Sequence, residues 1–226
     1  MIKKLVSILR SIFQYMCSFI YDTFIVLPLT SSIYKDESAR LNRVFIDQQS
    51  FSMIDIGCGT GLPLLEFMKT SKCNKVQAID IDEGYVVKAK QRFQNDERVL
   101  VKFKNFMNFD ETNKERFDVV FFGFSFMLMP DKVEALKKCR NLITDNGKIY
   151  MYLTLYHKKN LVAEFIKPKI KFLTSIDFGD TMYLDEIPDI LKKANFSLVS
   201  QERVASGKNL LKKMFNVYRL EVKPIN

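Results

Sequence analysis

The residues best suited to chemistry form one short segment, Asp55-Ile56-Gly57-Cys58-Gly59-Thr60-Gly61. Its three glycines stand at alternate positions between an apolar run, Met53 to Ile56, and a second one that begins at Leu62. Glycine permits positive φ and lets a ligand lie against bare backbone at the N-terminus of a helix. Asp80 ends the next apolar run, and its two acceptor oxygens suit a vicinal diol. The pattern predicts a ligand with vicinal hydroxyls, held between the glycine loop and Asp80.

The spacing of the glycines disfavours two other common cofactor loops. A dinucleotide-binding loop, G-x-G-x-x-G, needs its third glycine at position 62, where the chain has Leu62. A phosphate-cradling P-loop needs a following Gly-Lys-Ser/Thr, which is missing. For Asp80 the alternative role is that of a helix N-cap before Glu83.

The elements that must position these residues follow a strand and helix alternation from Ser50 onward. Such alternation is typical of a parallel sheet with helices on both faces. The tail ends in two strands around a turn at 206–208, which predicts a closing hairpin. We therefore expect an α/β, Rossmann-like fold with a mostly parallel seven-stranded sheet. Its expected strands are 53–56, 76–81, 99–103, 117–122, 148–155, 197–204 and 216–222, and its expected helices are 62–70, 83–94, 132–142 and 187–194.

Residues 1–34 differ from the rest of the chain. Residues 1–21 contain no acidic residue, and their apolar residues recur at helical spacing, which predicts an amphipathic helix. Asp22 and Pro28 interrupt the uncharged stretches, so no run of about 20 apolar residues exists to span a bilayer. Three roles remain open: a lid on the domain, an anchor in the membrane interface, or a cleaved presequence. We accordingly divide the chain into this segment, 1–34, and one domain over 35–226.

The segment D-I-G-C-G-T-G at 55–61 resembles the first motif of the class I S-adenosylmethionine (SAM) dependent methyltransferases. The order of the following elements, over roughly 51–155, is similar to theirs. The resemblance implies the methyltransferase fold, SAM as cofactor and methyl transfer as the activity, with Asp80 on the ribose hydroxyls. Gly123, Phe124 and Ser125 would line the junction of methyl donor and acceptor. The implied cofactor-binding residues are Asp55, Gly57, Cys58, Gly59, Gly61, Asp80, Ile81, Asn105, Phe106, Phe122 and Gly123.

Position 105 departs from the pattern of these enzymes. Asn105 stands where they usually carry an acidic residue for the adenine amino group. Its amide oxygen can still accept that hydrogen bond, and Phe106 can pack on the ring face.

Methyl transfer by in-line displacement needs chiefly an acceptor held in line with the leaving sulfur. A base matters only for an acceptor that is protonated at neutral pH. The candidates are His157, Tyr34, Asp177 and Tyr21. His157 directly follows an expected strand and titrates near neutral pH, although a structural or surface role is the alternative. Asp177 could instead cap a turn or contact a metal.

The cysteine and histidine content indicates no metal site. The four cysteines form no C-x-x-C pair, and His157 is the only histidine. Neither a zinc site nor a disulfide framework is indicated, and a reducing compartment fits best.

Charge favours an anionic partner. The formal net charge is +9, and five lysines alternate with apolar residues over 158–171. This mixture favours an anionic membrane surface, with a solvated helix face as the alternative. We expect a membrane-associated protein, at the cytoplasmic face or the mitochondrial inner membrane, that acts on a quinone or lipid. Nucleic acid is disfavoured, because residues 123–126 replace the Asn/Asp-Pro-Pro-aromatic motif of enzymes that methylate base amines.

Finer resemblances concern quinones. Residues 121–131 are similar to quinone-ring methyltransferases. Residues 21–24, 126–131 and 166–174 resemble rhodoquinone biosynthesis proteins, which keep the fold but use SAM as an amino donor to replace a methoxy group of ubiquinone. That resemblance implies nitrogen transfer and a divalent metal. The sequence also leaves open an RNA or protein methyltransferase and a non-catalytic SAM-binding subunit.

Overall fold

The computed structural model describes residues 27–109, 115–161, 164–165, 179–204 and 216–225. Its strands are β1 (Phe51–Ile56), β2 (Cys73–Asp80), β3 (Val99–Phe103), β4 (Phe117–Gly123), β5 (Ile143–Tyr156), β6 (Met182–Tyr183), β7 (Phe196–Arg203) and β8 (Val217–Pro224). Its helices are α2 (Leu27–Val44), α3 (Leu62–Met68), α4 (Glu83–Arg92), α5 (Lys132–Arg140) and α7 (Ile187–Ala194). Short 3₁₀ turns are η2 (Phe106–Asn108), η3 (Phe126–Leu128) and η4 (Leu184–Glu186).

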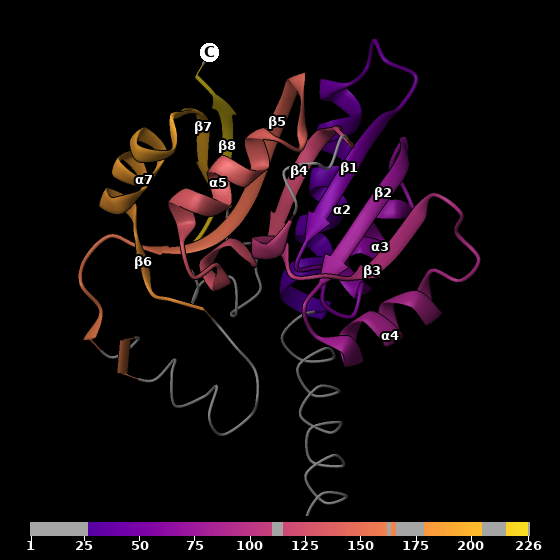
Figure 1. Cartoon of the computed structure of the whole chain (residues 1–226), viewed down its shortest axis with the longest axis horizontal. Coiled ribbons are helices and arrows are strands. Elements are labelled where there is room, and N and C mark those ends of the chain that lie inside the picture. The colour runs from indigo at the N-terminus through magenta and orange to yellow at the C-terminus, as the bar shows by residue number, and fades with distance from the viewer. Residues whose placement is uncertain (1–26, 110–114, 162–163, 166–178, 205–215, 226) are drawn as a thin grey trace, which may run out of the picture.

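The strands of the described residues form one twisted sheet in the order β3-β2-β1-β4-β5-β8-β7, with β6 added beside β5 (Figure 1). Pairing is parallel from β3 through β5, and β8 runs antiparallel to both of its neighbours. The predicted α/β fold with a mostly parallel sheet is confirmed. The expected turn at 206–208, between β7 and β8, lies outside the described residues.

Each face of the sheet supports its own core, because successive side chains of a strand point to opposite faces. Ile54 and Val120 face the core that α5 and α7 cover. Met53 and Phe121 face the other core, which α2, α3 and α4 cover. In Figure 1, α5 and α7 lie in front of the sheet and α2 lies behind it. The parallel strands are thus buried on both sides, as the alternation of strands and helices predicted.

The helix starts follow the local sequence. Asp82 caps α4 by accepting a hydrogen bond from the backbone N–H of Tyr85 at 2.9 Å, and Asp131 caps α5 in the same way. The N-cap of α4 is therefore Asp82 and not Asp80. The carboxylate of Asp80 is left at the strand end for another role.

Helix α2 continues beyond the predicted N-terminal segment, 1–34, into the predicted domain. It runs across the expected boundary at residue 34, so the structure has no break there. Ile33, Tyr34, Glu37 and Leu41 form its buried face, which packs on the sheet and α3. The amphipathic helix expected within 1–21 lies outside the described residues. Among the residues described, no helix is long and apolar enough to cross a membrane.

Candidate functional site

The glycine loop joins β1 to α3 and depends on left-handed backbone. Gly57, Gly59 and Gly61 have φ values of 75°, 55° and 72°. The N–H groups of Gly57 and Cys58 both donate to the carbonyl of Ile79, which ties the loop to the end of β2. A Cβ on Gly59 would meet no atom of the described residues within 4 Å, so the backbone at Gly59 borders open space among them. A ligand can therefore approach the backbone at this point.

Asp80 ends β2 directly beside this loop and is 9% exposed. One oxygen accepts from the N–H of Gly59 at 2.7 Å and the other from the N–H of Asp82 at 2.8 Å. Burial raises the pKa of Asp80, and the hydrogen bonds from Asp82 and Gly59 oppose that rise. Each oxygen retains a lone pair for a ligand hydroxyl, which fits the predicted ribose contact. Ile81 follows and is 64% exposed, so its side chain is open to a ligand or to solvent.

Asp55 lies on β1 just before the loop and is fully buried. Neither of its carboxyl oxygens has a hydrogen-bond partner among the residues that the structure describes. Burial, with a smaller contribution from the charge of Asp80, raises the pKa of Asp55 to about 8. Burial likewise raises the pKa of the neighbouring Cys58 thiol well above its usual range. A buried carboxyl without a partner marks a place where a cationic ligand group would gain a charge-assisted hydrogen bond.

The end of β4 meets helix α2. A Cβ on Gly123 would lie 1.7 Å from the hydroxyl oxygen of Tyr34, so only glycine allows this approach. Phe124 follows with φ of 68°, an uncommon conformation for a bulky residue and one that concentrates at functional sites. Ser125 then donates its hydroxyl to the carbonyl of Ile56, and a Cβ on Gly57 would meet the Ser125 Cβ at 2.5 Å. Tyr34, Gly123 and the glycine loop are thus joined by direct contacts.

Three predicted cofactor residues have other contacts in the structure. Asn105 accepts from the N–H of Met107 at 2.9 Å and so caps η2. The rings of Phe106 and Phe122 are 4% and 0% exposed and pack edge to face in the core under α5. Both rings therefore contact the core, and the contact of Phe106 with an adenine ring stays a prediction. Because η2 turns inward after β3, the sequence position alone gave no sign of this burial.

The structure separates the catalytic candidates. Tyr34 is 3% exposed and lies at the end of β4. His157 follows β5 as an exposed residue, and its Nε2 lies 2.7 Å from the hydroxyl of Tyr218. Tyr21 and Asp177 lie outside the described residues. Tyr34 and His157 both lie at the carboxyl end of the parallel strands, and Tyr34 is the one that approaches Gly123 beside the glycine loop.

No group of three or more His, Cys, Asp or Glu side chains with metal-binding geometry occurs in the part of the chain that the structure describes. The described residues therefore do not fit the divalent metal that the rhodoquinone resemblance implies.

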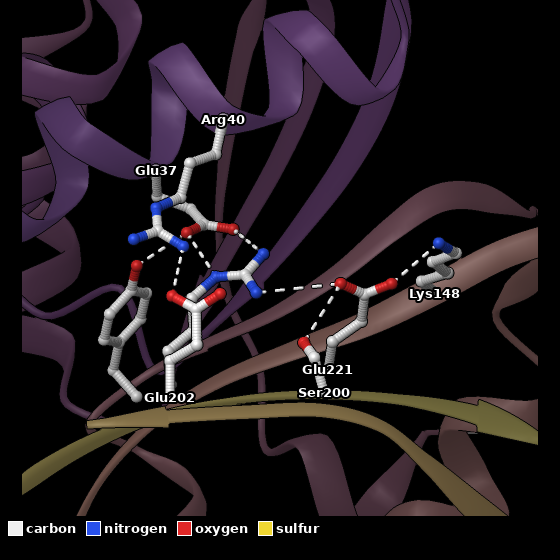
Figure 2. Close-up of polar contacts among 8 residues, drawn as sticks. Glu37, Arg40, Lys148, Ser200, Glu202 and Glu221 are labelled. Carbon is white, nitrogen blue, oxygen red and sulfur yellow. Dashed lines mark hydrogen bonds and ion pairs between the residues drawn. The ribbon is translucent and has the colours of Figure 1, made fainter. Parts of the chain in front are cut away.

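Sequence reasoning missed a buried ion pair behind this site. Glu37 of α2 and Arg219 of β8 are 0% and 4% exposed, and Tyr152 of β5 donates its hydroxyl to the same carboxylate. In Figure 2, Glu37 and Arg40 point from α2 toward the strands that carry Glu202 and Glu221. The available signal was a strand, 217–222, with charged residues at alternating positions among apolar ones. Such a pattern indicates a buried charge that needs a partner.

Comparisons with known proteins agree with this geometry. A family described as "Methyltransferase domain" matches residues 54–149. Malonyl-[acyl-carrier protein] O-methyltransferase 1 of Ilyobacter polytropus is 20% identical over 158 residues, which cover 69% of this chain and 56% of that protein. The chain thus spans little more than half the length of this curated relative.

Two solved structures have a similar fold. An S-adenosylmethionine-dependent methyltransferase from Clostridium acetobutylicum superposes with a TM-score of 0.65 and 14% identity, covering 92% of this chain and 97% of that one. The [4+2]-cyclase SpnF superposes with a TM-score of 0.66 and 13% identity, covering 85% and 82%. At these identities the likeness concerns the fold, and one fold can carry several chemistries.

Proposed function

We propose that this chain, which contains a methyltransferase domain of the class I SAM-dependent fold, binds SAM and transfers its methyl group to an apolar acceptor. The observation that carries the proposal is the pair of buried carboxyl groups at the glycine loop. Asp80 has lone pairs for ribose hydroxyls, and Asp55 is a buried carboxyl with no hydrogen-bond partner in the described part of the chain. SAM combines a vicinal diol with a cationic ammonium group, which are the two groups that these carboxyls would accept.

The chain's own residues supply binding and orientation. Gly59 leaves its backbone open to the cofactor, and Asp80 holds the loop through the Gly59 N–H. The sulfonium of bound SAM supplies an electrophilic methyl group. Tyr34 and Gly123 form the far end of the site, where we place the acceptor. Holding the acceptor atom in line with the methyl group is the main catalytic requirement, so no residue needs to act as a base.

An apolar acceptor in an anionic membrane is favoured by the surface next to β5. Lys158 and Lys159 are exposed, and Leu161 and Phe165, four positions apart, are 67% and 65% exposed. Exposed apolar side chains beside lysines are typical of a segment that lies in the interface of an anionic bilayer. We therefore propose a quinone or lipid as the acceptor, with the protein bound peripherally to the membrane.

The test separates cofactor binding from transfer. Calorimetry with SAM should give saturable binding that Asp80→Asn weakens, while Glu83→Gln, an exposed neighbour on α4, should leave it unchanged. Absence of SAM binding by the unmodified chain would refute the proposal.

Transfer is then measured with methyl-labelled SAM and a detergent extract of membranes, followed by mass analysis of the lipid and quinone fraction. Label in a lipid or quinone supports the proposal. SAM consumption without label, together with a quinone that has exchanged a methoxy group for an amine, would replace it with the amino-transfer reaction. Label in protein, including an acyl carrier protein, or in RNA would refute the membrane acceptor.

A further inference from the structure

The polar cluster under helix α2 is built around the carboxylate of Glu37. One of its oxygens accepts from the Tyr152 hydroxyl at 2.6 Å and from Arg219 Nε at 2.7 Å, and the other accepts from Arg219 Nη2 at 2.9 Å. The guanidinium also lies 4.7 Å from the ring centroid of Tyr150 and 3.6 Å from Glu221. Three elements, α2, β5 and β8, therefore meet at one carboxylate. We call Glu37, Arg219 and Tyr152 the α2 clamp.

The clamp contributes little net free energy to the stability of the fold. Burying two charges costs desolvation that their attraction only partly returns, and apolar residues of similar size often replace such pairs without loss. A two-point hydrogen bond between a guanidinium and a carboxylate instead restricts the relative orientation of the groups. The clamp thus specifies how α2 lies on the sheet, which points to a feature of α2 that has to be placed accurately.

That feature is Tyr34, one helical turn before Glu37 on the same buried face. The Tyr34 ring packs edge to face on Phe121 of β4 with centroids 5.0 Å apart, and its hydroxyl lies against Gly123. Tyr152 pairs with Gly123 in the β4–β5 register, and its carbonyl accepts from the N–H of Phe124 at 3.1 Å. Tyr34 and Tyr152 of the clamp therefore contact adjacent backbone positions, Gly123 and Phe124, at the end of β4.

The same backbone leads directly to the cofactor loop. Ser125, two residues after Gly123, donates to Ile56 and lies where a Cβ on Gly57 would stand. A shift of α2 would move Tyr34 relative to Gly123 without moving Gly57, because the glycine loop is held by β2. The clamp is therefore one of the contacts that fix the distance between Tyr34 and the loop, together with the packing of α2 on α3.

We propose that Tyr34 is a specificity-determining residue that contacts the acceptor, and that Glu37 and Arg219 are positioning residues that act through it. This inference rests on the proposed function, since it assumes that the acceptor meets the cofactor at the end of β4. It predicts that loss of the clamp impairs the use of the acceptor while the binding of SAM is retained.

The surface offers a matched control. Arg40 of α2 and Glu202 of β7 form an ion pair at 2.6 Å between the same helix and the same hairpin, but their side chains are 39% and 47% exposed. The two positions belong to neither the glycine loop nor the clamp, and Figure 2 shows their side chains joined by this ion pair. Arg40→Met combined with Glu202→Met therefore removes a link between these elements without touching the buried cluster.

The experiment compares this control with Glu37→Met combined with Arg219→Met, which leaves no unpaired buried charge. Protein labelled with 3-fluorotyrosine reports the surroundings of Tyr34 by ¹⁹F NMR, with the resonance assigned from Tyr34→Phe. In the clamp variant we expect that resonance to shift or broaden. The concentration of membrane extract that gives half-maximal label transfer should rise about tenfold or more, and the dissociation constant of SAM should stay within about twofold. The surface variant should match the unmodified protein in all three measurements.

Several outcomes would overturn the inference. An unchanged Tyr34 resonance with unchanged transfer would show that the clamp positions nothing, and equal effects in the surface variant would show that any link to α2 suffices. If the double variant does not fold, Glu37→Gln, which keeps the shape of the side chain, should give the same changes to a smaller degree, and their absence refutes the inference. If the unmodified chain binds no SAM, the proposed function fails, whereas the NMR comparison still tests the clamp.

Discussion

At the scale of single residues, Asp55 and Asp80 show how two carboxyl groups at one loop differ in environment. Asp80 has two backbone hydrogen bonds that favour its charged form, whereas Asp55 has none. The burial of Asp55 raises its pKa to about 8, so it holds a proton at neutral pH until a cation arrives. The loop thus offers one carboxyl group whose charged form is favoured by backbone hydrogen bonds and one whose charge depends on what binds.

The raised pKa of Asp55 predicts how stability depends on pH. The unfolded chain loses this proton near pH 4, whereas the folded chain keeps it up to about pH 8. The contribution of Asp55 to stability is therefore full below pH 4 and falls as pH rises from about 4 to 8, by at most about 1.4 kcal/mol per pH unit. We expect Asp55→Asn to remove this decline and to be the more stable protein at pH 8. Denaturant unfolding of both proteins at pH 5 and pH 8 checks this, and parallel curves would contradict it.

Asp80→Asn is predicted to weaken SAM binding. The amide keeps one acceptor oxygen but loses the charge and the second acceptor, and hydrogen bonds to charged groups contribute about 1.5–3 kcal/mol. The dissociation constant should therefore rise about tenfold to a hundredfold, as measured by calorimetry at pH 7. An unchanged constant would mean that the ribose lies elsewhere.

The sequence predicted the glycine loop and Asp80 because their chemistry is local: a strand end, a tight turn and the next strand end. It could not predict the α2 clamp, because Glu37 and Arg219 are 182 positions apart and meet only after the sheet has formed. Phe106 illustrates the same limit, since its place in the core depends on how η2 turns under α5.

At the scale of elements, two of the three glycines in the turn from β1 to α3, Gly59 and Gly61, both have positive φ but differ in their surroundings. An alanine at either position adopts a left-handed conformation, at a cost of about 1–2 kcal/mol. At Gly61 the new methyl group would also meet Phe93 at 2.8 Å and Ala89 at 3.2 Å, which adds about 1–3 kcal/mol of overpacking. At Gly59 it would meet nothing within 4 Å.

Gly61→Ala is therefore predicted to lose more stability than Gly59→Ala. Gly59→Ala should lose less stability than Gly61→Ala, yet it should reduce the affinity for SAM, because its methyl group enters the space beside the open backbone. Thermal unfolding and calorimetry on both variants provide the comparison, and equal losses of stability would argue against the contacts described for Gly61.

The strands and most helices followed from apolar periodicity, but α2 beyond residue 34 did not. Its buried face includes two polar residues, Glu37 and Ser38, both 0% exposed. The sequence of this closely packed helix therefore lacks the apolar periodicity that indicates a buried face. A charged residue on a buried face conceals the pattern on which such predictions depend.

At the scale of the whole molecule, the proposed membrane contact depends on residues 1–26 and on the lysines after β5. Residues 1–26 carry Lys3, Lys4 and Arg10, each expected to contribute about 1 kcal/mol on an anionic surface. Removing them should weaken binding to phosphatidylserine vesicles by at least about tenfold in a flotation assay. Lys158→Gln combined with Lys159→Gln is the matched variant. Undiminished binding after the truncation would mean that the segment 158–171, and not residues 1–26, binds the membrane.

The order of the strands also has a consequence for synthesis on the ribosome. Glu37 is made early, yet the residue that neutralises it lies on β8, which pairs between β5 and β7 and is the last strand of the described chain. Until β8 emerges, α2 can settle on the sheet only by burying a carboxylate without its guanidinium, which is strongly unfavourable. Helix α2 is therefore expected to dock late, after the C-terminal hairpin, and nascent chains stalled before residue 219 should leave it open to protease.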